Sequence, residues 1–208
     1  MDTVRPLRIV VFDRTCRGAT ALPGLSHAWS LGSWLYRARG AADVSFGASS
    51  WHEALEFLGT HRRESPIGEI QFWGHGKWGD ARIGGDCLTE RSLGRHGELR
   101  ALIGAVADRM SSGALFWLRT CESFGAARGH RFASALADRF GARVAGHTYV
   151  IGWWQSGLHR LDPGSVPDWD PEEGLLEGNA ARPERAAWST PAAPRTITCL
   201  DAALPDWA

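Results

Sequence analysis

Two short stretches of this sequence place reactive side chains directly after apolar, strand-like runs. In "EIQFWGHG", His75 lies between Gly74 and Gly76, and in "GALFWLRTC" a second apolar run leads to Cys121. A cysteine nucleophile needs a nearby proton acceptor, and a histidine can take the thiol proton and return it to a leaving amine. The pair therefore indicates acyl-transfer chemistry, provided that the fold brings the two residues together.

The glycines beside His75 have a use in such chemistry. They let a substrate backbone approach closely, and the Gly76 backbone N–H would be able to face a developing oxyanion. A lone cysteine in an apolar run is more often a small buried hydrophobe, and a lone histidine in a turn more often binds backbone. The functional interpretation therefore rests on the pairing of His75 with Cys121.

The elements that must position this pair alternate between strand and helix. Apolar, β-rich runs predict strands at residues 7–12, 43–49, 69–73, 114–118 and 143–152. Apolar positions at helical spacing predict four helices. The first covers residues 27–39, and the second begins after Ser50, which would cap it together with Glu53 three residues later. The third covers residues 99–110 and stops at Ser112-Gly113, and the fourth ends at Phe140 with Gly141 as its stop. Turn residues within 77–89 predict a small hairpin or an irregular loop.

Such alternation predicts an α/β fold with a mostly parallel sheet and helices on both faces. We expect a single domain over residues 1–208, with a core of about 5–152 and an irregular C-terminal extension, 153–208, in which only "RTITCL" resembles a strand. Sites in open α/β sheets form at the carboxyl ends of the strands. His75 and Cys121 are both expected at that edge.

Composition narrows the function classes. The chain has 208 residues, 23 basic and 23 acidic residues and no block of like charge, so neither nucleic acid nor an anionic membrane is favoured as a partner. The sequence has no apolar run of about 20 residues and its start does not read as a secretory signal. We expect a soluble cytoplasmic protein whose four scattered cysteines are free thiols.

Other kinds of site have weaker support. His75, Asp80, Asp86 and Cys87 lie in one short segment, but their spacing matches no zinc motif, so no metal is expected. The glycine-rich "RIGGDC" has no phosphate-binding lysine, so no nucleotide cofactor is expected either. Two further histidines, His147 and His159, flank the fifth predicted strand without a clear partner and are expected at strand ends or on the surface.

The two stretches together resemble the caspase-like cysteine peptidases, which include caspases, metacaspases, gingipains, legumain and separase. The shared signature is an apolar strand ending in His-Gly and a later apolar strand ending in Cys, matched here by "IQFWGHG" and "ALFWLRTC". In caspases the histidine lies about 50 residues before the cysteine. Here the two positions, 75 and 121, are 46 apart. The resemblance, closest to bacterial caspase-like domains of unknown function, covers about residues 5–152 in element order and a handful of positions in detail.

The resemblance implies roles for these residues. It makes His75 the general acid/base, Cys121 the nucleophile and the backbone N–H groups of Gly76 and Cys121 the oxyanion hole. It implies a peptide or protein substrate, no cofactor, and activation by processing or by a partner protein. The flank "RTCES" departs from the Gln-Ala-Cys pattern of caspases.

Substrate preference is open at this stage. Candidate substrate-binding residues are Asp13, Arg14, Arg17, Asp80, Glu122, Trp153 and Trp154. The two arginines would bind an acidic side chain, as arginines near the end of the first strand do in caspases. The three acidic residues would serve a basic side chain, as in metacaspase-like relatives, and the tryptophans would form an aromatic wall.

Two classes of function follow. The first is a cysteine endopeptidase that works through a His75–Cys121 dyad with a backbone oxyanion hole. The second is a catalytically inactive caspase-like domain that serves in binding, scaffolding or signalling, in which His75 and Cys121 are structural.

Overall fold

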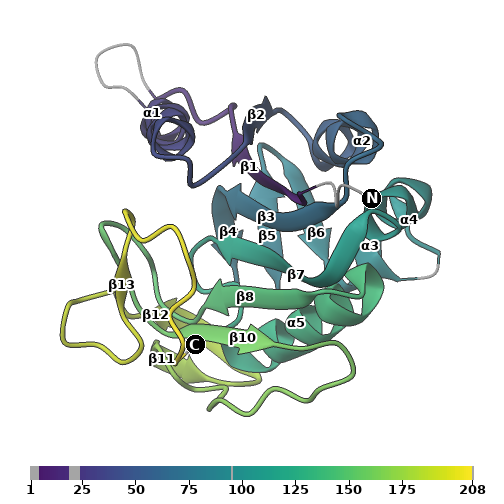
Figure 1. The fold of residues 1–208 in the computed structure, drawn as a ribbon. Coiled ribbons are helices and arrows are strands. Elements are labelled where there is room, and N and C mark those ends of the chain that lie inside the picture. Colours follow the sequence, from purple (N-terminus) through teal and green to yellow (C-terminus); the bar gives the residue numbers. More distant parts are fainter. Residues whose placement is uncertain (1–4, 19–23, 95, 208) are drawn as a thin grey trace.

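A computed structural model describes residues 5–18, 24–94 and 96–207 of the chain. Its centre is a six-stranded sheet with the strand order β10-β8-β7-β3-β1-β2 (Figure 1). The strands of this sheet are β1 (Leu7–Asp13), β2 (Val44–Ala48), β3 (Ile67–Trp73), β7 (Met110–Arg119), β8 (Arg143–His147) and β10 (Leu158–Leu161). Neighbouring strands are parallel except for β10, which pairs antiparallel with β8. The predicted mostly parallel α/β sheet is therefore confirmed.

The remaining elements surround this sheet. The helices are α1 (Leu25–Ala38), α2 (Trp51–Thr60), α3 (Glu90–Leu93), α4 (Arg100–Ala107) and α5 (Ala126–Phe140). A three-stranded antiparallel sheet is formed by β4 (His75–Lys77), β5 (Asp80–Ile83) and β6 (Asp86–Thr89). Two small pairs complete the chain: β9 (Trp154–Gln155) with β13 (Ile197–Thr198), and β11 (Leu175–Asn179) with β12 (Arg182–Ala186).

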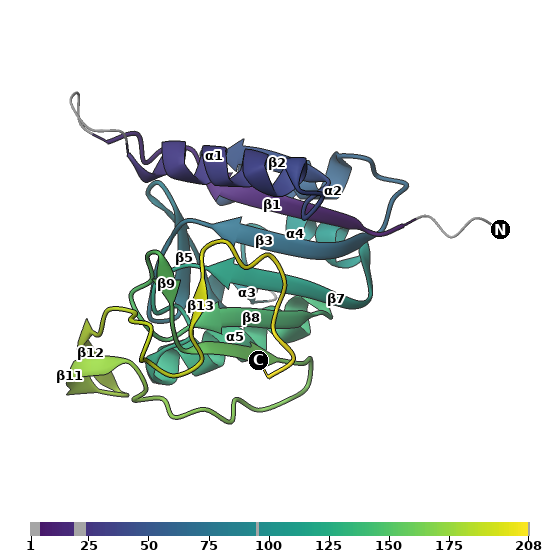
Figure 2. The same cartoon turned by 60° about the vertical axis from the view of Figure 1, so that its left-hand side comes forward.

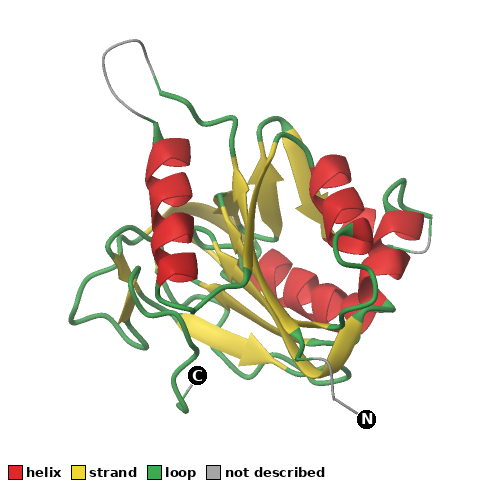
Figure 3. Ribbon diagram, turned by 45° about the horizontal axis from the view of Figure 1, so that its top comes forward, coloured by secondary structure: helices red, strands yellow, loops and turns green. Residues whose placement is uncertain are grey.

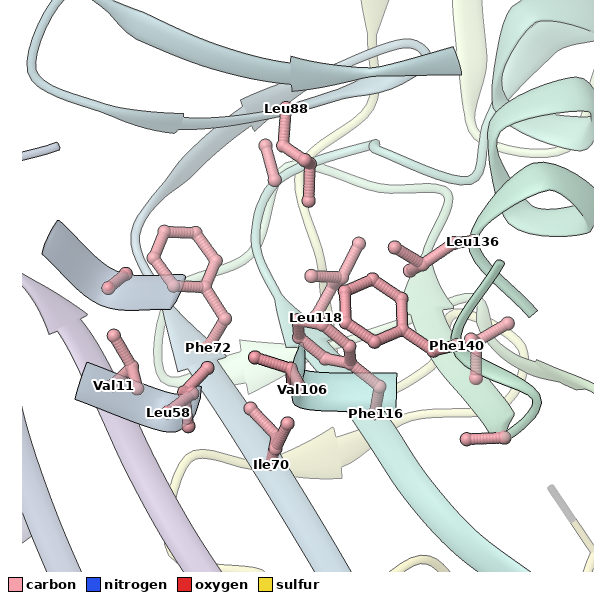
Figure 4. Close-up of a cluster of buried hydrophobic side chains, with 14 of the residues drawn as sticks. Val11, Leu58, Ile70, Phe72, Leu88, Val106, Phe116, Leu118, Leu136 and Phe140 are labelled. Carbon is pink, nitrogen blue, oxygen red and sulfur yellow. The ribbon is translucent and has the colours of Figure 1, made fainter. Parts of the chain in front are cut away.

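Both faces of the central sheet are covered, because its strands are apolar at consecutive positions. In β7, Phe116 and Leu118 belong to the main core with residues of α2, α4 and α5 (Figure 4). Trp117 lies in a separate cluster with Ile197. Successive strand side chains point to opposite faces, so a continuous apolar run fits a strand that is buried on both sides. The main core alone contains 31 buried residues, enough to hold the sheet edge rigidly.

The opposite face of the sheet carries α1 and the C-terminal segment. Tyr36 of α1 packs with Val10 and Trp73, and its ring lies 4.9 Å from that of Trp73. Figure 3 shows α1 on one side of the sheet and the other helices on the far side. Figure 2 shows the C-terminal segment crossing the same face as α1. Helices on both faces are thus confirmed.

Local signals for two helix ends are confirmed. The Ser50 side chain caps α2 by accepting a hydrogen bond from the Glu53 backbone N–H, at 3.1 Å. Gly141 follows α5 with φ +59°, a left-handed conformation that glycine adopts without strain. Apolar residues on the inner face of α2, Leu55 and Leu58, are fully buried, as their spacing predicts.

Three boundaries differ from the prediction. The helix predicted at 99–110 ends at Ala107, and Met110 begins β7, so Ser112-Gly113 lies inside a strand instead of stopping a helix. The strand predicted at 143–152 ends at His147. The C-terminal extension is less irregular than expected, because β10 completes the main sheet well beyond residue 152.

None of the helices in the described ranges has the length and apolar character needed to cross a bilayer. All four cysteines are free thiols, as predicted.

Candidate active site

The ends of β3 and β7 lie side by side in the centre of the sheet. Trp73 and Arg119 are register partners at the last positions of the two strands. His75 and Cys121 each follow two residues later, so parallel pairing carries both to the same edge. Their placement at the carboxyl ends of neighbouring strands was a prediction from the sequence pattern and agrees with the structure.

Tight packing explains the glycines on either side of His75. A Cβ atom at Gly76 would lie 2.8 Å from the Cβ of Thr120, and one at Gly74 would lie 2.5 Å from the Phe72 ring. Real Cβ atoms do not approach that closely, so any side chain at either position would separate the strand of His75 from its neighbours. The glycines therefore let the β4 backbone rest directly against the turn that carries Cys121.

Hydrogen bonds fix the turn around Cys121. The backbone N–H of Glu122 donates to the Tyr149 carbonyl at 2.9 Å, and that of Phe124 donates to the His147 carbonyl at 3.0 Å. Glu122 has φ +30°, an uncommon conformation for a residue with a side chain. Strain of this kind persists only where surrounding contacts impose it, and it gathers at functional sites.

A cavity of about 380 Å³ opens at this edge, and both His75 and Cys121 line it. The rest of its wall comes largely from α1, from the segment after Ile151 and from the C-terminal segment. Aromatic rings of Trp29, Trp73 and Trp153 contribute to the lining. The cavity is large enough for one or two side chains of a peptide.

The Cys121 thiol is protonated at neutral pH. Its pKa is raised to about 11, mainly by burial and in smaller part by the negative charge of Glu122, while hydrogen bonds with the backbones of Ile151 and of Cys121 itself offset part of the rise. The sulfur lies 3.8 Å from the carbonyl oxygen of Ile151, to which the thiol donates. In the free protein this residue is therefore a neutral thiol and not a preformed thiolate.

His75 has a second thiol as its neighbour. Its Nε2 atom lies 3.5 Å from Sγ of Cys16, in the loop that follows β1. The Trp29 ring meets the imidazole edge-on at 5.5 Å. The imidazole is exposed on its other side, so it can reach both solvent and the cavity.

The carboxyl group of Glu122, next to Cys121, also has a shifted pKa. Burial and the charge of Asp80 raise it, the charges of Lys77 and Arg82 lower it, and the resulting pKa is about 7. One carboxylate oxygen has no hydrogen-bond partner among the described residues. At neutral pH this carboxyl group is therefore divided between its two protonation states.

Six of the seven predicted substrate-binding residues lie outside the cavity wall, so the prediction is wrong for them. Asp13 is buried and accepts hydrogen bonds from the backbone of Thr15 and Gly84. Arg14 pairs with Glu53 at 2.9 Å, and Asp80 pairs with Arg82 at 2.6 Å. Arg17 is exposed in the loop that also contains Cys16.

Trp153 is the one predicted substrate-binding residue that the cavity wall contains, and Trp154 and Glu122 lie next to wall residues in the chain. Trp153 lines the cavity and is 58% exposed, which agrees with the predicted aromatic wall. Trp154 lies in β9, where it pairs with Thr198. Glu122 follows Cys121 directly, with its side chain near Lys77 and Arg82.

Arg119 is a cavity residue that the sequence analysis missed. It lies two positions before Cys121 at the end of β7, is 4% exposed and lines the cavity. Its guanidinium donates to the side chains of Gln155 and Tyr36. The signal was present in the sequence, because Arg119 is a single charge at the end of the otherwise apolar run "ALFWL".

The two histidines predicted at strand ends or on the surface are both buried, so the surface alternative is wrong, and His147 is the last residue of β8. His147 is 0% exposed and His159 1% exposed. His147 lies within 3.1 Å of the Ser156 carbonyl, and His159 lies 3.1 Å from both carboxylate oxygens of Glu173. In the described part of the chain, no three His, Cys, Asp or Glu side chains come together as ligands for a metal ion.

Neither a family model, nor a curated protein, nor a solved structure matches this chain. The fold and the site therefore define its class by themselves. It is an α/β protein with a six-stranded, mostly parallel sheet. The carboxyl edge of that sheet holds a cavity lined by a histidine and a cysteine.

Proposed function

We propose that this chain is a caspase-like cysteine endopeptidase in which Cys121 is the nucleophile and His75 the general acid/base. The observation that carries the proposal is the shared cavity: both side chains line one space of about 380 Å³ at the carboxyl edge of the sheet. The substrate is a peptide or protein, and the aromatic lining that includes Trp153 suits its side chains. No cofactor and no nucleic acid takes part.

The reaction starts from a protonated Cys121 thiol. Because the Cys121 pKa is about 11, the thiol keeps its proton until a substrate carbonyl is in place. Sulfur then attacks the carbonyl carbon while the proton passes to His75, and the oxyanion is held by the backbone N–H groups of Gly76 and Cys121. His75 returns the proton to the leaving amine, which breaks the peptide bond and leaves a thioester on Cys121. Water, deprotonated by His75, then hydrolyses the thioester and restores the thiol.

Free thiols support a reducing setting for this activity. All four cysteines are unpaired with one another, and disulfides are rare in cytosolic proteins. We place the enzyme in the cytoplasm. A possible activating partner protein is part of the proposal, because the resemblance to caspase-like peptidases implies one.

The test compares single variants on a panel of coumarin-labelled tetrapeptides and on unfolded casein. We expect Cys121→Ala and His75→Ala each to lower kcat/KM by a factor of about 10³ or more, since nucleophile and base act as a unit. Cys87→Ala is the matched control, because Cys87 is exposed and is not part of the cavity wall. Cleavage that survives in Cys121→Ala would refute the dyad.

The second candidate is an inactive caspase-like binding, scaffold or signalling domain. The specific observation in its favour is the contact between His75 and Cys16, which engages one imidazole nitrogen away from Cys121. On that interpretation the cavity binds a peptide without cleaving it. This candidate would be favoured if the wild-type protein binds a peptide and intact-protein mass spectrometry never detects an acyl group on Cys121.

A further inference from the structure

The cavity that His75 and Cys121 share has a wall of mostly uncharged side chains. In the described part of the chain, no aspartate, glutamate or lysine lines it, and Arg119 is its one arginine. A basic ligand side chain in this space would be removed from water without meeting a counter-charge, and burial of an unpaired charge is costly. The lining therefore disfavours a lysine or arginine side chain as the ligand.

Arg119 is the fixed cation of the wall, and oxygen atoms of the protein occupy its donors. Its guanidinium donates to Gln155 Oε1 at 2.9 and 2.7 Å and to the Tyr36 hydroxyl at 2.6 Å. It also donates to the backbone carbonyls of Asp201 and Thr198, at 2.9 and 3.0 Å. A guanidinium has five N–H donors, so these five bonds leave none for a ligand. An acidic side chain therefore gains no hydrogen bond from Arg119 as the structure holds it.

Aromatic rings supply the largest side chains of the wall. The Trp29 ring meets that of His75 edge-on at 5.5 Å, and the Tyr36 ring meets that of Trp73 edge-on at 4.9 Å. The Trp73 indole N–H donates to the Gln71 side chain at 3.1 Å, and the Tyr36 hydroxyl donates to backbone carbonyls of the C-terminal segment. Because the protein engages these polar atoms itself, the two rings offer a ligand their apolar carbon atoms.

Three further wall residues form an apolar rim where the cavity meets solvent. Leu25 is 49% exposed, Trp153 58% and Leu200 42%, and all three line the cavity. They come from separate parts of the chain: α1, the segment after β8 and the C-terminal segment. Exposed large apolar side chains that gather at the mouth of one cavity are typical of a binding site for an apolar group.

We propose that this cavity binds the side chain of a large apolar residue, such as phenylalanine or leucine, just before the cleaved bond. The position in the substrate rests on the proposed peptidase function. Cys121 attacks the carbonyl carbon of that residue, so the side chain begins two bonds from the reacting atom and lies against the wall that contains the thiol. Removing the ligand side chain and the apolar rim from water supplies the binding free energy.

The experiment measures binding, so that it is independent of turnover. Cys121→Ala protein is titrated with fluorescein-labelled tetrapeptide amides that differ only in the last residue, and affinity is read by fluorescence anisotropy. We expect the Phe peptide to bind at least about tenfold more tightly than the Ala peptide, with the Leu peptide between them, because the larger side chain buries more apolar surface. The Asp and Lys peptides should bind no more tightly than the Ala peptide.

A matched pair of variants on α1 assigns this preference to the cavity. Ala28 lines the cavity, whereas Ala38, the last residue of the same helix, is exposed and is not part of the wall. In the Cys121→Ala background, Ala28→Phe should fill the space and remove the preference for the Phe peptide over the Ala peptide, while Ala38→Phe should keep it. Affinity for the Ala peptide is the internal reference, because a misfolded variant would lose that binding as well, and the peptide series itself needs no wall variant.

Three results would overturn the proposal. The first is equal affinity for the Phe and Ala peptides, and the second is tightest binding of the Asp or Lys peptide, which would mean that a charge decides the preference. The third is tighter binding of a fluorescein-labelled octyl amide than of the Phe peptide, which would assign the cavity to a lipid chain.

The same measurements separate this proposal from the peptidase activity. A preference for the Phe peptide in a protein whose wild type cleaves nothing would support the apolar site and refute only the peptidase. Cleavage by wild type without a preference for the Phe peptide would refute the apolar site and leave the peptidase standing.

Discussion

The Nε2 atom of His75 lies 3.5 Å from the sulfur of Cys16, although Cys121 lines the same cavity as His75. The imidazole therefore has two thiols within its surroundings, one on the loop after β1 and one on the turn after β7. Both thiols are partly buried, and burial raises the pKa of Cys121 to about 11. Which thiol reacts with a substrate is the first matter to test.

Replacing each of these cysteines separates their roles. We expect Cys16→Ala to keep kcat/KM within about threefold of wild type, because its thiol contacts His75 from outside the cavity wall, whereas Cys121→Ala lowers it by about 10³ or more. Alkylation by a peptidyl acyloxymethyl ketone, in which the cysteine sulfur displaces the carboxylate leaving group and forms a thioether, checks the same point when the label is located by peptide mass spectrometry. Label on Cys16 in place of Cys121 would reverse the assignment of the nucleophile.

Alkylation of Cys121 should depend steeply on pH. With a pKa of about 11, its thiolate fraction at pH 7 is about 10⁻⁴ and rises about tenfold per pH unit up to pH 10. The iodoacetamide rate at this residue, followed by peptide mass spectrometry in the native protein, should rise in parallel. A rate that levels off below pH 8 would show instead a thiolate already stabilised by His75.

Acid should destabilise the protein through His147. The pKa of this residue is lowered to about 3, mainly by burial and in smaller part by the charge of Arg119. A histidine with a folded-state pKa below its unfolded value of about 6.5 stabilises the fold fully above pH 6.5, and this contribution is lost as the pH falls towards 3. The free energy of unfolding should therefore drop by about 2 kcal/mol between pH 7 and pH 5 from this residue alone.

The variant His147→Asn isolates that contribution. Its side-chain N–H can still donate to the Ser156 carbonyl, which lies 3.1 Å from Nδ1 of His147, but it carries no titrating group. Urea unfolding at pH 7 and pH 5 should give a decrease that is smaller in His147→Asn than in wild type by roughly those 2 kcal/mol. Equal decreases in the two proteins would mean that His147 does not control acid stability.

A methyl group at Gly76 should disturb the site more than one at Gly85. A Cβ at Gly76 would lie 2.8 Å from Thr120, whereas one at Gly85 meets nothing within 4 Å. We expect Gly76→Ala to lower the free energy of unfolding by about 1–3 kcal/mol and to reduce kcat/KM, because it pushes β4 away from the Cys121 turn. Gly85→Ala should change neither quantity measurably in the same urea and peptide assays, and a similar loss in both variants would refute the close contact as the cause.

The sequence pattern predicts most of the fold because the central strands are apolar throughout. "ALFWL" indicates a strand covered on both faces, and the structure buries Phe116 and Trp117 on opposite sides. The helix before it could not be delimited from periodicity. Met110 continues the helical stripe of Ile103 and Val106, yet it pairs with Ile67 as the first residue of β7, and such pairing is set by tertiary contacts.

The site was predictable only in part. His75 and Cys121 stand out because each follows an apolar run. The surroundings of Arg119 do not, since four of its five N–H donors bond to residues 155, 198 and 201, which lie far along the chain from position 119. The burial of His147 was missed for a similar reason. Strand β10 lies antiparallel beside β8, with Leu158 as the partner of His147, and no short-range sequence pattern predicts this pairing.

β3 lies in the middle of the sheet, so Ile67 pairs with both Leu7 and Met110, each more than 40 residues away along the chain. Folding must close these long loops before the contacts compensate for the lost chain entropy, which makes assembly of the sheet a slow and non-local event. His75 and Cys121 follow the ends of β3 and β7, and therefore meet only once this central pairing has formed. In a partly folded chain in which β3 and β7 are not yet paired, the cavity is not formed, and neither half of the sheet brings His75 and Cys121 together.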